Sequence, residues 1–139
     1  MPQSAVYVLF PDAELRLSLR FLLEAYGFTV FAFAKIEDLL AAHAPGSTGC
    51  LLLAQDMPRG SGTACLARLR RKSFTLPTVI VTDVLSDRLS RRAARLGAAV
   101  VESLAVDMLV EAVRRALLVG PSRASDEDES GDDASSASQ

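Results

Sequence analysis

Residues 49–62 read GCLLLAQDMPRGSG and hold a short apolar run followed by a polar turn. The run from Cys50 to Leu53 contains no polar residue, which is typical of a strand covered on both faces of a parallel sheet. Pro58 and Gly60 then interrupt regular structure. A helix is expected next, over residues 62–71. A strand followed directly by a helix is the repeating unit of an α/β fold.

The same alternation extends through the chain on both sides of this unit. Asp12 can cap the first helix, and Gly27 can end it in a left-handed turn. Apolar residues of that helix recur at helical spacing, at Leu15, Leu19, Leu22 and Tyr26. We expect strands at residues 5–10, 28–33, 50–53, 78–82 and 98–101, and further helices at 36–43, 62–71, 86–96 and 106–118.

Five strands alternating with five helices predict a doubly wound α/β domain, with a parallel sheet and helices on both faces. In such sheets the binding crevice lies at the carboxyl ends of the strands, so function is sought first after Phe10, Leu53 and Thr82. The domain is expected to cover residues 1–120. Residues 121–139 are rich in Ser, Asp and Glu and are expected to form a disordered acidic tail.

Composition restricts the classes of protein further. The chain has 139 residues, half of them hydrophobic, which suffices for one buried core. Cys50 and Cys65 lie in apolar segments, which favours reduced thiols in a cytoplasmic protein. Because His43 is the only histidine, we expect no zinc site and no other metal. No basic leader and no apolar run of roughly 18 residues is present, so neither secretion nor a membrane partner is expected.

Charge is divided unevenly along the chain. Residues 1–123 hold all 15 basic residues and 11 of the 17 acidic ones, whereas residues 124–139 hold six acidic residues and no basic one. The tail therefore reverses the sign of a domain that is basic on its own. It could fold back over a basic surface as a salt-sensitive competitor for a partner, or it could only increase solubility.

Four strings, in order and at matching separations, resemble the receiver domain of bacterial response regulators over roughly residues 5–118. VYVLFPDAELRLSLRFLLEAYGF (6–28) is similar to the family's first strand and helix, and GCLLLAQDMPRGSG (49–62) to its third strand and following loop. LPTVIVTD (76–83) resembles its fourth strand, and ARLGAAVVESL (94–104) its fifth. The resemblance implies a CheY-like, five-stranded parallel sheet of strand order 2-1-3-4-5.

The resemblance also implies where phosphorylation chemistry would lie. Receivers bind Mg²⁺ through two acidic residues and accept a phosphoryl group on an aspartate, because a carboxylate attacking phosphorus needs a cation to offset charge. Here the two acidic positions are Phe10 and Pro11, the acceptor position is Ala54, and the family's lysine becomes Ser103. Only the hydroxyl residue Thr82 is retained. We therefore predict a degenerate site that cannot transfer phosphate.

Two nearby acids are candidates for a displaced acceptor. Asp12 comes one residue late, where a helix cap is the favoured interpretation. Asp56 lies two residues beyond the strand end, where a solvated or turn-stabilising role is favoured. The aromatic residue by which receivers transmit their state is replaced by Val100, so the family's two-state switch is expected to be absent.

A basic stripe is predicted on the helix at residues 86–96, opposite an apolar stripe. The simpler interpretation of the basic stripe is an ordinary solvent-exposed helix face without a partner. Since receivers dock partners through their fourth and fifth helices and fifth strand, its functional interpretation is a docking surface. No aromatic stacking residues or groove-entering motif favour direct binding of nucleic acid. The basic stripe is Arg88, Arg91, Arg92 and Arg95, and Arg114 and Arg115 on the last helix are expected to extend it. The apolar stripe is Leu85, Leu89, Ala93 and Leu96.

Together these features predict a phosphorylation-independent interaction module in bacterial signal transduction or transcription control. It is not expected to be an enzyme or to hold a cofactor, and its partner is a protein or a second copy of itself. The alternative is a ligand or redox sensor that uses the altered crevice or the pair Cys50 and Cys65. A phosphotransfer receiver with a displaced aspartate is the least favoured.

Overall fold

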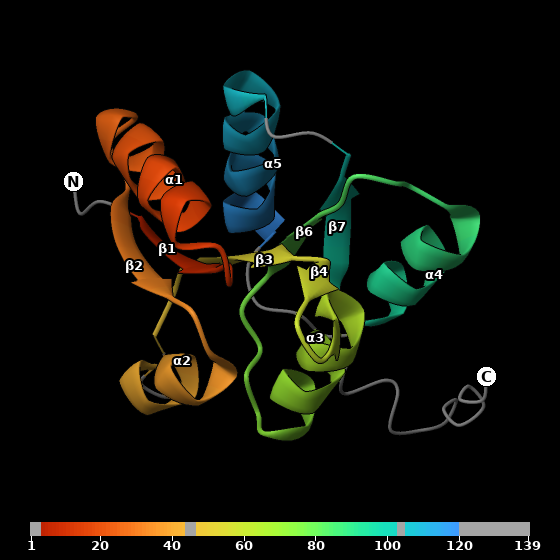
Figure 1. Ribbon diagram of the computed structural model, residues 1–139. Coiled ribbons are helices and arrows are strands. Elements are labelled where there is room, and N and C mark those ends of the chain that lie inside the picture. Colours follow the sequence, from red (N-terminus) through yellow and green to blue (C-terminus); the bar gives the residue numbers. More distant parts are fainter. Residues whose placement is uncertain (1–3, 44–46, 103–104, 120–139) are drawn as a thin grey trace.

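The computed structural model describes residues 4–43, 47–102 and 105–119, and it contains a five-stranded parallel sheet (Figure 1). The order of strands across the sheet is β2-β1-β3-β6-β7. When only these five strands are numbered, the order is 2-1-3-4-5, which confirms the predicted fold. Ser103 and the predicted tail lie outside the described residues. The strands are β1 (Ala5–Leu9), β2 (Thr29–Phe33), β3 (Cys50–Ala54), β6 (Thr78–Val81) and β7 (Ala98–Val101).

Helices cover both faces of the sheet (Figure 1). The sheet divides the core into two clusters of buried side chains, one on each face. Alternate residues of β1 enter different clusters: Val6 and Val8 pack under α1 and α5, whereas Tyr7 and Leu9 pack under α2, α3 and α4. None of the described helices has the length and hydropathy that crossing a membrane requires. The helices are α1 (Ala13–Ala25), α2 (Ile36–Ala42), α3 (Gly62–Arg71), α4 (Asp87–Arg95) and α5 (Val106–Val119).

A short hairpin that was not predicted lies between β3 and α3. It pairs β4 (Asp56–Met57) with β5 (Gly60–Ser61) in antiparallel fashion. Gly60 has φ +129°, a left-handed conformation that glycine adopts without strain. Two-residue strands give no periodic signal, so the sequence indicated only a loop here. The hairpin holds the polar turn of residues 55–61 in one conformation above the carboxyl edge of the sheet.

The residues of α1 that are buried differ from those that the apolar spacing in the sequence predicts. Leu19 is buried, but Leu22 and Tyr26 are exposed, and Leu23 is buried in their place. The reason is that α1 carries apolar residues on most of its circumference, including the exposed Leu17 and Phe21. Apolar periodicity alone therefore does not fix the rotation of this helix.

The apolar stripe predicted beside α4 is wrong at one position. Leu85 precedes the helix and is 44% exposed, because α4 begins only after Ser86, whose Oγ accepts a hydrogen bond from the Leu89 amide at 3.1 Å. Ala93 is buried, and Leu89 and Leu96 are partly buried, as the stripe predicts.

Arg70 on α3 is buried and connects three segments of the fold. Its Nε donates to the carbonyl oxygen of Leu96 at 2.8 Å, and its Nη1 donates to those of Phe74 and Leu76, both at 2.9 Å. Burial lowers the pKa of the guanidinium to about 10, so it stays protonated at neutral pH. The guanidinium joins the end of α3, the approach to β6 and the end of α4.

Candidate functional site

The register of the sheet brings the predicted crevice residues to one edge. Leu9 pairs with Leu53, and Ala54 pairs with Val81, so the chain leaves β1, β3 and β6 on the same side. A pocket of about 510 Å³ opens there. Its lining includes Phe10, Pro11, Asp12, Ala54, Asp56 and Thr82, so the residues that sequence reasoning singled out on separate loops lie together.

The floor of this crevice is apolar. The Phe10 side chain is 3% exposed and Ala54 is 7% exposed, and both belong to the core cluster under α1 and α5. Phe10 therefore occupies space in the core as well as at the crevice. No oxygen ligand is contributed from the ends of β1 and β3 at these positions.

The loop after β1 is held by Arg16, a residue that sequence reasoning missed. Its Nη1 donates to the carbonyl oxygens of Phe10 at 2.7 Å and of Pro11 at 3.2 Å. Asp12 is the N-cap of α1, since its Oδ1 accepts from the Leu15 amide at 3.0 Å. That geometry confirms the capping interpretation of Asp12. The spacing of Arg16 from Asp12, one helical turn, would indicate an ion pair between the two side chains and not the backbone acceptors that Arg16 binds.

The loop after β3 is fixed by Gln55. Its backbone amide donates to the Val81 carbonyl oxygen at 2.8 Å, and its backbone carbonyl oxygen accepts from the Gly62 amide at 2.9 Å. Its side-chain Oε1 accepts from the Thr63 amide at 3.1 Å. These bonds supply partners for free amides at the start of α3. The beginning of α3 is therefore locked to the edge of the sheet.

Thr82 lies at the crevice, and its hydroxyl is already engaged. Its Oγ1 accepts from the Val84 amide and lies 3.2 Å from the Val84 carbonyl oxygen. The backbone amide of Thr82 donates to Val101 on the edge strand at 3.0 Å. Thr82, the residue retained from the family pattern, therefore uses its hydroxyl to stabilise the loop between β6 and α4.

Three carboxylates, from Asp12, Asp56 and Asp83, line the rim of the crevice. All three side chains belong to exposed residues. Over residues 4–43, 47–102 and 105–119, no group of three or more His, Cys, Asp or Glu residues is arranged to hold a metal ion. The rim is therefore acidic without forming a coordination site in this part of the chain.

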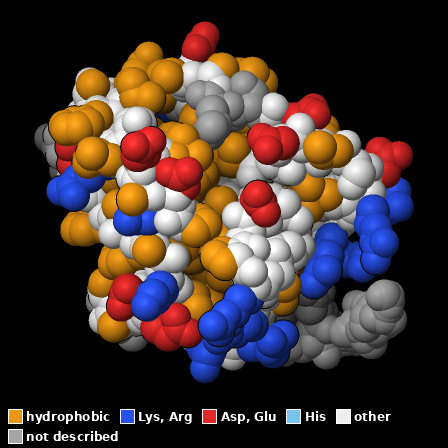
Figure 2. Space-filling view, viewed as in Figure 1, with side chains coloured by type: hydrophobic (Ala, Val, Ile, Leu, Met, Phe, Trp, Pro, Cys, Tyr) orange, Lys and Arg blue, Asp and Glu red, His pale blue; other side chains and the backbone are white. Residues whose placement is uncertain are grey.

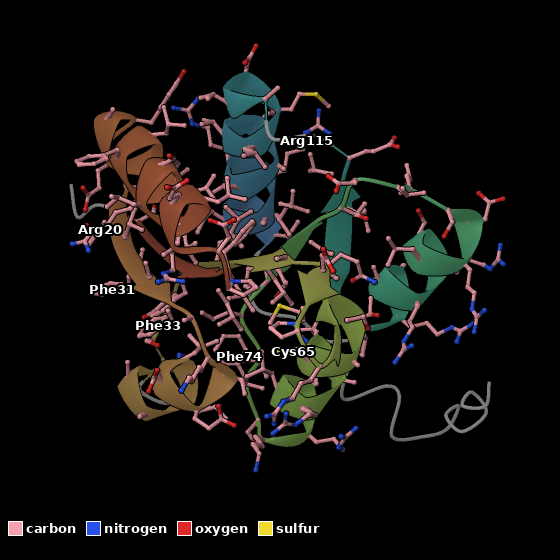
Figure 3. All side chains as sticks on the ribbon, viewed as in Figure 1. Arg20, Phe31, Phe33, Cys65, Phe74 and Arg115 are labelled. Carbon is pink, nitrogen blue, oxygen red and sulfur yellow. The ribbon has the colours of Figure 1, made fainter. Side chains whose placement is uncertain are left out.

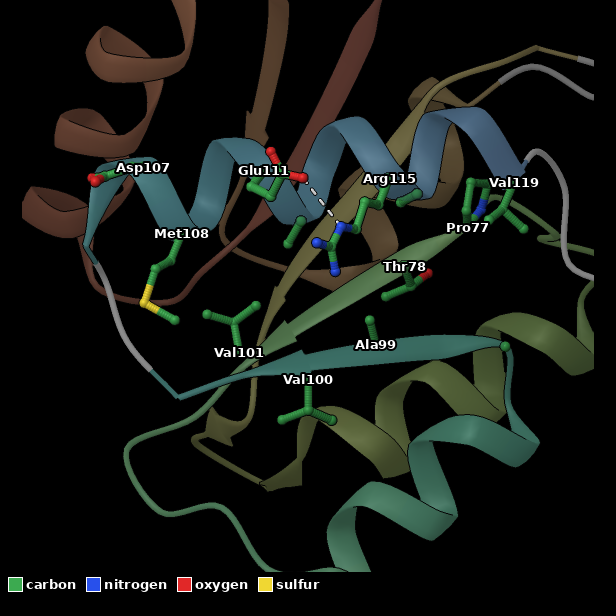
Figure 4. Close-up of a pocket in the computed structure, with 13 residues that line it drawn as sticks. Pro77, Thr78, Ala99, Val100, Val101, Asp107, Met108, Glu111, Arg115 and Val119 are labelled. Atoms are coloured by element: carbon green, nitrogen blue, oxygen red, sulfur yellow. Dashed lines mark hydrogen bonds and ion pairs between the residues drawn. The ribbon is translucent and has the colours of Figure 1, made fainter.

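The predicted basic stripe lies on the exposed side of α4, and Figure 2 shows Lys and Arg side chains gathered at that helix. A second hollow, of about 660 Å³, runs between β7 and α5 (Figure 4). Arg115 lines it and forms an ion pair with Glu111 at 3.1 Å. Arg114 is not part of its lining, because consecutive helical residues point about 100° apart. Of the two arginines of α5, only Arg115 therefore lines this hollow, and their predicted role in extending the basic stripe stays a prediction.

The cysteines do not form a redox pair. Cys50 belongs to the core cluster under α1 and α5, and Cys65 to the cluster under α2, α3 and α4, so the sheet lies between them. Burial raises the pKa of the Cys50 thiol to about 12 and also raises that of Cys65, which keeps both thiols protonated. The redox alternative based on this pair is wrong for the described structure.

Strand order, helices on both faces and a pocket at the carboxyl edge define a doubly wound α/β domain of the flavodoxin type. Residues 11–113 match the family described as the response regulator receiver domain, and the chain belongs to that family. Receiver domains are signalling modules of two-component regulators and interact with proteins such as kinases and regulators.

The transcriptional regulatory protein FixJ of Bradyrhizobium diazoefficiens is 34% identical over 93 residues, which are 67% of this chain and 45% of that protein. Nodulation protein W of the same organism is 29% identical over 96 residues, 69% of this chain and 42% of that protein. The solved structure of response regulator StyR has a TM-score of 0.75 and 28% identity, covering 85% of this chain and 61% of that one. The chain spans less than half the length of the curated relatives it matches.

Proposed function

We propose that this receiver-like domain works without phosphorylation and regulates bacterial signal transduction or transcription by binding a protein. The observation that carries the proposal is the chemistry of the crevice. Phe10 and Pro11 stand where the family has metal-binding acids, and Ala54 stands where it has the acceptor. An alanine methyl cannot attack phosphorus, and a phenylalanine ring and a proline ring give Mg²⁺ no oxygen ligand.

The neighbouring groups support this proposal. Arg16 holds the loop after β1 by hydrogen bonds to backbone oxygens, and this arrangement needs no metal ion. Asp12 is engaged as a helix cap, and Asp56 is exposed in the hairpin. The retained Thr82 hydroxyl bonds to its own loop. Asp83, the third acid of the rim, follows β6, so none of the three acids has the position of an acceptor that ends β3.

We assign partner binding to the surface made by α4, β7 and α5. The stripe Arg88, Arg91, Arg92 and Arg95 is exposed there, and β7 is an edge strand, paired with β6 alone. The groove beside α5 adds apolar surface from Val101, Met108 and Val119. The exposed arginines of α4 fit a protein partner with acidic side chains, or a second copy of this chain if its acidic side chains meet the stripe, and the groove beside α5 adds apolar contact area.

A backbone NMR titration of the full chain with Mg²⁺ and beryllofluoride, a phosphoryl mimic, tests phosphate independence. We expect no saturable shift of the Phe10, Ala54 or Thr82 amides, because no carboxylate ends β3. The single variant Ala54→Asp should also stay silent, since the Mg²⁺ ligands are still missing.

The matched positive control is the triple variant Phe10→Asp, Pro11→Asp, Ala54→Asp, which restores all three carboxylates. Shifts in the unmodified chain that reach α4 would mean that Asp12 or Asp56 has become an acceptor, and phosphorylation independence would be wrong.

Charge reversal tests the partner surface. The double variant Arg91→Glu, Arg95→Glu should weaken self-association or partner binding by about tenfold at low salt, and by less at high salt, because these are exposed rim charges. Light scattering measures self-association, and a pull-down measures partner binding. Arg114→Glu is the control off the groove; because it makes half of the charge change of the double variant, the single variants Arg91→Glu and Arg95→Glu are measured beside it. Equal effects of the control and the double variant would move the interface elsewhere.

A further inference from the structure

A third hollow, of about 440 Å³, lies between α2 and α3 and is separate from both surfaces described above. The start of α2 forms one wall, and the first two turns of α3 form the other. The β4–β5 hairpin closes it, and Met57 and Pro58 of that hairpin separate it from the crevice. Nothing in the proposed function uses this α2–α3 pocket.

Unpaired cations surround the α2–α3 pocket. Lys35, Arg59 and Arg68 line it, and so does a single acid, Glu37. Within the part of the chain that the structure describes, none of these four side chains forms an ion pair or hydrogen bond. Arg16, Arg20, Arg70 and Arg115, by contrast, are each engaged. The charged residues that line the pocket therefore sum to a net charge of +2.

Its floor is apolar and electrically neutral. Ile36 and Cys65 are buried residues that line it, and Met57 supplies a flexible side chain. Cys65 lies on the α2 side of α3 (Figure 3) and is 9% exposed. Burial raises the pKa of its thiol, Arg68 lowers it less, and Glu37 raises it, so the thiol stays protonated while both charged side chains act on it. The floor thus offers an uncharged surface directly beneath the cations.

The fold holds these groups in fixed relation to one another. Ala64 and Arg68 lie one helical turn apart on α3 and face the pocket together. Arg59 lies at the tip of the hairpin, whose pairing of Met57 with Gly60 holds that turn over the pocket. Because Gln55 locks the start of α3 to the sheet, the cations on α3 and on the hairpin share one rigid support.

We propose that the α2–α3 pocket binds an amphipathic organic anion, with its apolar body on the floor and its carboxylate or phosphate among Lys35, Arg59 and Arg68. A bare inorganic anion would leave the apolar floor uncovered, and an organic cation would meet three like charges. The volume lies within the range of about 300 to 1,000 Å³ that is usual for small-molecule sites. The exposed Arg71 at the end of α3 adds to the positive charge on this helix and favours the approach of an anion.

The test is an NMR titration of the full chain with four probes of equal chain length: octanoate, octyl phosphate, octanol and octylamine. Octanoate and octyl phosphate should give saturable shifts of the Lys35, Glu37, Cys65 and Arg68 amides. The tighter of the two identifies the preferred head group. Octanol should bind about tenfold more weakly, because it lacks the charge, and octylamine should not bind. Equal binding of octanol or octylamine would overturn the proposal, as would anion-induced shifts confined to other surfaces.

Substitutions locate the anion. Arg59→Gln and Arg68→Gln should each weaken octanoate binding about fivefold, since each removes one charge-assisted contact. Arg91→Gln on α4 is the matched control and should leave the affinity unchanged. All three residues are exposed, and thermal unfolding verifies that each variant is folded. Equal loss of affinity in the Arg91 control would indicate general charge attraction and refute the site.

Cysteine alkylation gives an independent reading of the same pocket. Saturating octanoate should slow the reaction of Cys65 with iodoacetamide, a neutral reagent, by covering the floor. Cys50 is fully buried under the opposite face of the sheet and serves as the internal control. An unchanged Cys65 rate at octanoate concentrations that saturate the NMR shifts would place the ligand outside the pocket.

Discussion

Arg70→Met lowers the free energy of unfolding by about 3 to 5 kcal/mol. The guanidinium satisfies the carbonyl oxygens of Leu96, Phe74 and Leu76, in a buried setting where water cannot easily replace it. Each buried carbonyl left without a donor costs on the order of 1 to 3 kcal/mol. Apolar replacement of a buried ion pair can be neutral because both partners leave together. In this protein the partners of Arg70 are backbone carbonyl groups, which stay in place and lose their hydrogen-bond donor when the arginine is replaced.

Urea unfolding at neutral pH measures this loss, and Arg71→Met is the matched control. Arg71 is the next residue of α3 and is exposed. Its replacement should change stability by no more than about 0.5 kcal/mol. Arg70→Lys should fall between the two, because one ammonium group cannot reach acceptors on both sides as the guanidinium does. Similar midpoints for the Arg70→Met and Arg71→Met variants would show that the three carbonyls find other donors.

Gly62→Ala has the second large expected effect on stability. It is expected to destabilise the protein, although helix propensity alone predicts stabilisation. An alanine inside a helix is normally favoured over glycine by about 1 kcal/mol. At Gly62, however, a Cβ would collide with the Ala54 carbonyl oxygen and come within 3.0 Å of the Gln55 Cα. Both are backbone atoms of the sheet edge and cannot rotate away. We expect a net destabilisation of about 2 kcal/mol, in the range of overpacked cores.

Thermal unfolding measures this effect, with Ala64→Val as the control for added bulk at an exposed position of the same helix. The control should cost no more than about 0.7 kcal/mol, the range of ordinary helix propensities. The Ala54 and Gln55 amides should also shift in the Gly62→Ala spectrum, because they form the contact. A Gly62→Ala protein as stable as the unmodified chain would mean that α3 can move away from the crevice.

Sequence alone predicted the sheet well, because the fold depends on short apolar runs separated by helices. Cys50 to Leu53 are buried without exception, as a strand covered on both faces requires. The predicted ends of strands and helices differ from the observed ones by at most one residue, which is within the usual uncertainty of such boundaries. The hairpin at residues 56–61 was missed, since two paired residues per strand carry no periodicity.

The crevice could be predicted in part. Phe10, Ala54 and Thr82 were brought together by knowing that parallel strands end on one edge, and the capping role of Asp12 followed from its place before a helix. Arg16 was missed because its acceptors are backbone oxygens, which leave no trace in the sequence.

Arg70 shows most clearly why the remainder was not predictable. Its spacing from Leu66 and Leu69 puts it on the buried face of α3, yet an arginine in a basic run indicates a solvated surface. Only the three-dimensional meeting of α3, the approach to β6 and the end of α4 creates acceptors for it. The same holds for the α2–α3 pocket, whose cations come from separate segments of the chain.

The parallel sheet also has a consequence for how the chain reaches this fold. Every pair of neighbouring strands in the five-stranded sheet is parallel, so each pairing must first close a loop that includes a helix or more. Pairing Val6 with Cys50, for example, closes a loop that contains the whole chain between them, including β2 and α2. Sheet formation is therefore governed by high contact order and loop-closure entropy. We therefore expect individual helices to form early and the sheet that they cover to assemble late.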